Sequence, residues 1–321
     1  MPEVSAESSL RSGRVLAGVA LGAYALQLAG VYWDVGWHHA RGRETFWSPP
    51  HLALYAGVTL ALLAAALGML GERRRSGTYR PAALGPLIQL AAAPVDELWH
   101  RIFGQDVSIW SPPHLLGIMG GIVGILGWIL AVSPGGGRAG GGKASPGIAG
   151  ALAVLLLAGA LFALGEYDHD EASRGPWLYP MLTSLLAPWI LVAARGWLGR
   201  RWAGTAIAVG YTAVRWALAG AVWAGGLPWM GVPPFIVVAA YVADRVMFRA
   251  GAGLAGAAFG IAFTITDYPL ALHLSGRTWG AGAWVGTLPA AAAAGWASAR
   301  LGRWLWEGSR RRTACGRPRK E

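Results

Sequence analysis

Long apolar stretches dominate this sequence, and a membrane-spanning helix needs about 20 such residues in a row. Only 13% of the 321 residues are charged, whereas about a quarter are charged in an average soluble protein. We therefore predict an all-α fold, a polytopic transmembrane helix bundle of about ten spans. The predicted spans cover residues 15–37, 49–71, 81–100, 112–132, 147–166, 176–194, 204–224, 231–248, 251–274 and 280–299.

Basic residues gather in the loops on one side of the predicted bundle. That side holds 21 of the 27 Lys and Arg residues, and loops rich in Lys and Arg usually stay in the cytoplasm. We therefore predict a multi-pass protein of the cell (plasma) membrane with both termini in the cytoplasm. This distribution argues against nucleic acid as a partner despite the net charge of +11. Membrane lipid and other membrane subunits are the expected partners.

The predicted organisation follows from these spans and loops. Two repeated helical hairpins carry the candidate metal site, and six further transmembrane helices follow a Gly-rich linker. In chain order, the segments are a cytoplasmic N-terminus (1–14), the hairpins (15–133), the cytoplasmic linker (134–146), the six helices (147–299) and a basic cytoplasmic tail (300–321). The single cysteine, Cys315, excludes a disulfide framework and a Cys-rich metal site.

Two short phrases each occur twice in the proposed hairpins. "WSPPHL" stands at Trp47–Leu52 and again at Trp110–Leu115. An Asp-x3-His pair precedes each copy, as "DVGWH" at Asp34–His38 and "DELWH" at Asp96–His100. We interpret each pair of phrases as one unit, in which a helix ends near the Asp and His and the next helix begins at Ser-Pro-Pro-His.

Each phrase has a local structural meaning. Residues four apart share one helix face, so Asp34 lies beside His38. Serine is a common N-cap, and proline is favoured at the first helical position. We therefore expect Ser48 and Ser111 to cap helices whose third residues are His51 and His114. The positive end of a helix dipole disfavours a protonated imidazole, and the neutral form is the one that binds metal.

The short loop in each unit brings the second histidine beside the Asp-x3-His pair. The predicted metal ligands are Asp34, His38, His51, Asp96, His100 and His114. A set of nitrogen and oxygen donors without sulfur suits a transition metal ion such as copper, zinc or iron. We expect the two sets to border one outer cavity, because repeats in membrane proteins often pack about their symmetry axis.

Asp34-x3-His38-x12-His51 resembles the metal-site motif in the C subunit of the membrane-bound copper monooxygenases that oxidise methane and ammonia. The resemblance covers about 18 residues of the first hairpin, and it implies copper ligation by Asp34, His38 and His51. The second copy has one more residue in its loop, and the family's motif is single. The doubled phrase also looks like uncharacterised multi-pass proteins of prokaryotes.

Several functions stay open at this point, and the sequence does not decide whether the protein is an enzyme. The leading hypothesis is a membrane protein with an outward-facing His/Asp metal centre, either an oxidoreductase subunit or a metal-handling protein. One alternative is a transporter or permease, although ionisable residues are scarce in the inner halves of the spans. Another is a structural protein whose repeated motif only packs helices. Asp267 and His273 can serve either helix pairing or the site.

Overall fold

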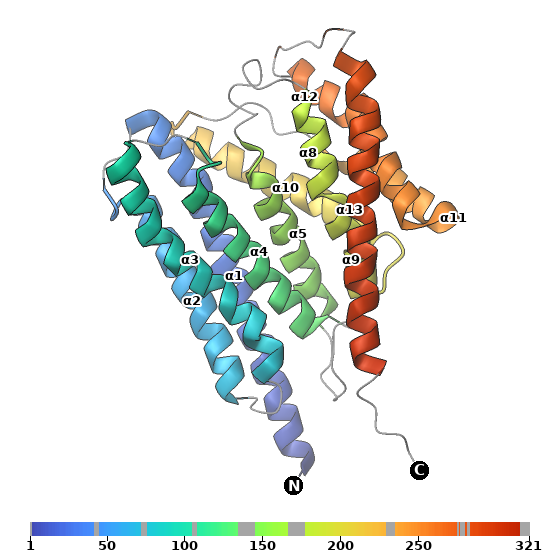
Figure 1. Cartoon of the computed structure of the whole chain (residues 1–321). Helices are drawn as coiled ribbons and strands as arrows, with labels where there is room; N and C mark the ends of the chain where they lie inside the picture. Colours follow the sequence, from blue (N-terminus) through green and yellow to red (C-terminus); the bar gives the residue numbers. More distant parts are fainter. Residues whose placement is uncertain are drawn as a thin grey trace, which may run out of the picture. The chain divides into compact units, whose positions relative to one another are not determined.

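The structure is a computed structural model in which every regular element of the described residues is a helix (Figure 1). The described residues are 2–41, 45–71, 76–104, 108–133, 145–165, 177–228, 235–274, 276, 280 and 283–314. Most of the Gly-rich linker, His169 and Cys315 lie outside these ranges. Contacts divide the chain into unit 1 (Met1–Gly159, Leu218–Trp229 and Arg310–Glu321) and unit 2 (Ala160–Ala217 and Met230–Ser309).

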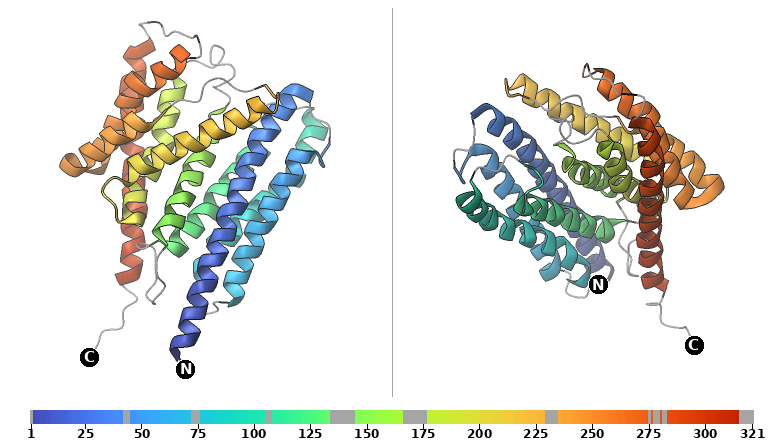
Figure 2. Two further views of the ribbon diagram at one scale, coloured as in Figure 1. Left: turned by 180° about the vertical axis from the view of Figure 1, so that it is seen from behind. Right: turned by 45° about the horizontal axis from the view of Figure 1, so that its top comes forward.

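Unit 1 is built around four long helices that run side by side in all views (Figures 1 and 2). α1 packs along α2 and α3 along α4, and α2 also packs against α3. Only seven residues separate α1 from α2 and only eight separate α3 from α4, so each helix end lies near the start of the next helix. The helices are α1 (Pro2–Arg41), α2 (Pro49–Gly71), α3 (Ser76–Phe103) and α4 (Pro112–Val132), followed by α5 (Pro146–Phe162).

Glycines let α3 and α4 approach each other closely. A Cβ atom at Gly85 would collide with the backbone of Gly124, and one at Gly127 would collide with the backbone of Ala82. Small residues at such crossings are typical of helices that pack in membranes, where van der Waals contact contributes to association. The crossing therefore depends on glycine at these positions.

Unit 2 contains the remaining helices, together with most of α10 and α13 (Figure 1). α11 and α13 meet where the backbones of Gly256 and Gly295 touch. The elements are α8 (Leu178–Leu186), α9 (Pro188–Leu198), α10 (Ala203–Ala224), α11 (Val237–Ala262), the π-helix η2 (Phe263–Asp267), α12 (Tyr268–Leu274) and α13 (Ala283–Ala314).

Six helical stretches of the described residues are long and apolar enough to cross a membrane, so the chain is a helical protein of membrane type. They are Gly13–Arg41, Pro49–Gly71, Pro112–Val132, Leu178–Leu198, Ala203–Ala224 and Val237–Leu274. The expectation of about ten spans is not supported. α5 has only 17 residues, and α3 carries Asp96, Glu97 and Arg101 near its end.

Two of the expected spans, 231–248 and 251–274, belong to one helical stretch with a break inside it. The break is at Gly251, whose φ of 84° and ψ of 179° are not helical. A positive φ of this kind is readily adopted only by glycine, because a Cβ would clash with the backbone. The expected boundary thus coincides with a bend in α11.

Two buried aspartates satisfy helix starts in unit 2. Oδ2 of Asp267 accepts a hydrogen bond from the Ala239 backbone N–H at 2.9 Å, and Oδ2 of Asp244 accepts one from Thr205 N–H at 2.8 Å. The first N–H groups of a helix have no partner within the helix, so a buried carboxylate is well placed there. Asp267 therefore serves helix pairing, one of its two expected roles.

Candidate metal centre

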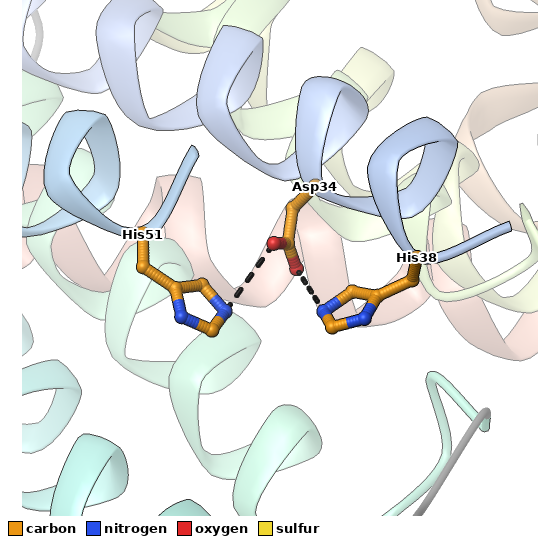
Figure 3. A group of neighbouring side chains, drawn as sticks. All are labelled: Asp34, His38 and His51. Carbon is orange, nitrogen blue, oxygen red and sulfur yellow. Dashed lines mark ion pairs between the residues drawn. The ribbon is translucent and has the colours of Figure 1, made fainter. Parts of the chain in front are cut away.

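The six predicted ligands lie at one end of the α1–α4 group, where two helices end and two begin. Asp34 and His38 occupy the last turns of α1, and His51 is the third residue of α2. Figure 3 shows the Asp34 carboxylate between the two imidazoles. We call Asp34, His38 and His51 the first triad, and Asp96, His100 and His114 the second triad. In each triad, the ligand atoms lie within 4.8 Å of one another.

The first triad is centred on both carboxylate oxygens of Asp34. Nε2 of His38 is 3.4 Å from Oδ2, and Nε2 of His51 is 3.2 Å from Oδ1 (Figure 3). The two imidazole centroids are 5.9 Å apart. The carboxylate therefore spans the gap between a helix end and the following helix start.

The second triad has the same members but uses a single oxygen. Nε2 of His100 and Nε2 of His114 each lie 3.3 Å from Oδ1 of Asp96. The imidazole centroids are 6.3 Å apart. Because both imidazoles face one oxygen atom, the donor atoms converge on one side of the carboxylate.

Three of the four imidazoles are held by backbone carbonyl groups through their other nitrogen. Nδ1 of His51 is 3.3 Å from Phe46 O, Nδ1 of His100 is 3.2 Å from Gly104 O, and Nδ1 of His114 is 2.9 Å from Ser108 O. A carbonyl only accepts, so each Nδ1 carries the hydrogen and donates it. In the neutral imidazole, Nε2 then has a free lone pair aimed at the carboxylate. Metal-binding histidines are usually oriented in this way.

The nitrogen–oxygen distances can be compared with those of an ion pair and with those of a metal site. A charge-assisted N–H···O bond is about 2.7–2.9 Å long, whereas the four distances here are 3.2–3.4 Å. Two donor atoms about 2.1 Å from a tetrahedral ion lie about 3.4 Å apart. Oδ1 of Asp34 is also buried without a hydrogen bond of suitable geometry among the described residues. The members of each triad are therefore close enough together that they could hold a metal ion.

Access differs between the triads. In the first triad, the more exposed imidazole is that of His38 at the end of α1. Its side chain is 29% exposed, whereas that of His51 is 11% exposed. In the second triad, the more exposed imidazole is that of His114 at the start of α4. Its side chain is 37% exposed, whereas that of His100 is 6% exposed. Each triad therefore has one protected and one accessible imidazole.

The expected serine caps are not formed. Both helices begin as predicted, at Pro49 and Pro112, but Ser111 makes no side-chain cap hydrogen bond. In the part of the chain that is described, Oγ of Ser48 and Oγ of Ser111 are both buried without a partner. Consecutive prolines remove two of the N–H groups that a cap would satisfy, so the hydroxyl has little to accept from.

A contact that the sequence analysis missed joins the two hairpins beneath the triads. Nε2 of Gln89 donates a hydrogen bond to Oε1 of Gln27 at 2.9 Å. Each glutamine lies seven residues before the aspartate of its hairpin. The signal in the sequence was the repeated "QLA" at 27–29 and 89–91, which extends the two recognised phrases towards the N-terminus.

Comparisons with known proteins identify no relative. No protein-family model, no curated protein and no solved structure matches the chain. The functional argument therefore rests on the geometry of the two triads.

Proposed function

We propose that the protein is an integral membrane metalloprotein with an outward-facing metal centre, in which each triad holds one transition metal ion. The proposal rests on the distances between imidazole Nε2 atoms and aspartate oxygens. These distances are 3.2–3.4 Å, and the arrangement occurs in both hairpins. Without a metal ion or further protons on the Nε2 atoms, these lone pairs and the negative charge would repel one another. An ion between them removes the repulsion and uses all three donors.

Copper is the metal that we favour. The donor set is two imidazoles and one carboxylate, which suits Cu²⁺, Zn²⁺ or Fe²⁺, and Cu²⁺ binds a given site of this type most tightly of the three. Three protein ligands leave a coordination position open, as in catalytic rather than structural sites. The role that we propose is an oxidoreductase subunit, as the resemblance to copper monooxygenases implies, or a metal-handling protein.

We also propose that the two hairpins are copies of one unit related by an internal two-fold axis. Gln27 and Gln89 are separated by 62 residues, as are Asp34 and Asp96, and the two glutamines touch. Equivalent residues that contact each other lie on a symmetry axis. These observations support a common outer space bordered by both triads.

The orientation that we propose places this space outside the cell and both termini in the cytoplasm. The support is the excess of Lys and Arg in the loops on the opposite side. A periplasmic reporter fused to the C-terminus tests the orientation. An inactive reporter is expected, and an active one would reverse the assignment of the two sides.

Elemental analysis of the purified full chain tests metal binding. Wild-type protein is expected to carry about two ions per chain, one for each triad. Asp34→Asn removes the charge and one donor, so it should lose the ion of the first triad. Glu97→Gln is the matched control, since Glu97 is a partly exposed carboxylate on α3 that pairs with Arg101 at 3.0 Å. It should leave the metal content unchanged.

Two results would overturn the proposal. Wild-type protein that carries no metal after loading with copper, zinc or iron would make the triads ion pairs that only pack helices. Equal metal loss in Asp34→Asn and Glu97→Gln would place the metal elsewhere on the surface.

A further inference from the structure

Three buried polar atoms lie between the helices of unit 1. They are nearer to the middle of α1 and α3 than the triads are. They are Nε2 of Gln27, Oε1 of Gln89 and the hydroxyl of Tyr24, and within the described residues none has a hydrogen-bond partner. Gln27 is 5% exposed and Tyr24 is 2% exposed. Buried polar groups are almost always paired with protein or with ordered water, so this cluster calls for an occupant.

The chemistry of the three atoms specifies the occupant. Nε2 of Gln27 donates, Oε1 of Gln89 accepts, and the Tyr24 hydroxyl does both. A molecule that accepts from Nε2 of Gln27 and donates to Oε1 of Gln89 satisfies both amide atoms. Water has these properties, and it usually makes two to four hydrogen bonds when buried, about three on average.

Glycines on one face of α4 line the same place. A Cβ at Gly124 would collide with the Tyr24 hydroxyl, and one at Gly121 would lie 3.3 Å from Nε2 of Gln89. The two glycines are one helical turn apart, so the hydroxyl and the amide pair lie over neighbouring positions of α4. The Tyr24 hydroxyl therefore lies directly against Gly124, and the Gln89 amide lies beside Gly121.

Gly117 leaves open space on α4 between this cluster and the second triad. It lies between His114 and Gly120 on the same face of α4, and within the described residues a Cβ there would meet no other atom within 4 Å. The corresponding position of the first hairpin is Leu54, which packs onto Gly30. The two hairpins therefore differ here: Leu54 packs onto Gly30 in the first, whereas in the second no described residue packs at Gly117.

We propose that Tyr24, Gln27 and Gln89 hold ordered water beneath the triads, and that this water exchanges with the outer space through the gap beside Gly117. The glutamines are two helical turns, about 10 Å, from the aspartates along α1 and α3. This hydrated site is independent of metal binding. If the triads hold metal as proposed above, it supplies water to the second triad from within the bundle.

Radiolytic hydroxyl-radical labelling of the full chain, read by mass spectrometry, tests the proposal. Radicals formed from a bound water oxidise the nearest side chain, so Tyr24 should be labelled several-fold faster than its exposure allows. Tyr268 is the matched control, because it is equally buried at 2% and stacks on Tyr179 with centroids 5.2 Å apart. It should be labelled slowly.

Two variants assign the water to these residues. Gln27→Leu with Gln89→Leu should reduce labelling of Tyr24 to the rate of Tyr268. Gly117→Leu places a leucine where the first hairpin has Leu54. It is designed to fill the open space beside Gly117 while leaving Gln27 and Gln89 unchanged. It should slow the exchange of the water near Tyr24 with bulk H2(18)O, followed as the isotope in the oxidised product.

Each result decides the matter. Labelling of Tyr24 no faster than that of Tyr268 would show that the cluster is dry. Fast labelling that persists in the double leucine variant would place the water elsewhere, and exchange unchanged in Gly117→Leu would reject the proposed passage. Asp34→Asn should label like wild type, so failure of the metal proposal and failure of the water proposal are separable.

Discussion

Gln27 and Gln89 occupy equivalent positions in two hairpins, and their side-chain amides are hydrogen-bonded to each other at 2.9 Å. Replacing either one by leucine leaves the other amide buried without its partner. We expect each single variant to lose about 1–3 kcal/mol of stability. The double leucine variant should lose less than the sum, because it removes both polar groups. Unfolding of the purified protein in mixed detergent measures this cycle, and strictly additive losses would show that the contact contributes nothing.

Metal should stabilise the folded protein against heat. An ion that binds only the native state contributes about 2.7 kcal/mol at a concentration 100 times its Kd. We expect the melting temperature to rise on copper addition and to fall again with a chelator. His38→Ala should reduce the rise, whereas His39→Ala, on the neighbouring histidine outside the triads, should not. Equal effects of the two variants would contradict the assigned ligands.

The number of ions left after removal of one triad reports whether the triads act separately. His38→Ala combined with His51→Ala deletes both imidazoles of the first triad. Because the second triad has its own three donors, about half the metal should remain, with its affinity little changed. Loss of nearly all the metal would instead mean that both triads hold one shared set of ions. Elemental analysis with a binding titration separates the two results.

Two glycines on one face of α4 should respond oppositely to the same substitution. Gly124→Ala forces a methyl group into the Tyr24 hydroxyl, and such overpacking typically costs about 1–3 kcal/mol. Gly117→Ala meets open space and gains helix propensity, so it should be neutral or slightly stabilising. Thermal unfolding of the two variants side by side measures the difference. Similar losses of stability in the two variants would show that the contact with the Tyr24 hydroxyl is not the cause of the loss.

Gly251 should be intolerant of any side chain. Its φ of 84° is accessible to alanine only with strain of about 1–3 kcal/mol. Gly251→Ala is therefore expected to lower the melting temperature, or to straighten the bend in α11. Gly253→Ala is unsuitable as a control, since a Cβ there meets the Trp296 ring. Gly220→Ala, which meets no atom within 4 Å, serves instead and should be tolerated.

The sequence predicted that the members of each triad converge, because this geometry is local. Asp34 and His38 must share a helix face, and two consecutive prolines must start the next helix, so a short turn leaves little choice about where His51 lies. The Gln27–Gln89 contact was not predictable in this way. It joins helices that are not neighbours in sequence, and an uncharged amide in an apolar stretch carries no charge signal.

The number of spans was the weakest expectation, and Gly251 illustrates the reason. Hydropathy finds apolar stretches, but it does not separate a loop between two spans from a bend within one stretch. The buried position of Asp267 was equally hidden, because the N–H of Ala239 that it accepts from is 28 residues away. Both features depend on how helices pack, which composition does not encode.

α3 contains Pro81, Pro86 and Pro94, and it is not among the helices apolar enough to cross a membrane on their own. Yet it packs along both α2 and α4. During synthesis, α1 and α2 have the hydropathy to enter the bilayer unaided, whereas α3 would gain from a partner that covers its polar groups. We expect it to enter together with α4, after the α1–α2 hairpin is in place. The first triad would then be assembled in the nascent chain before the second exists.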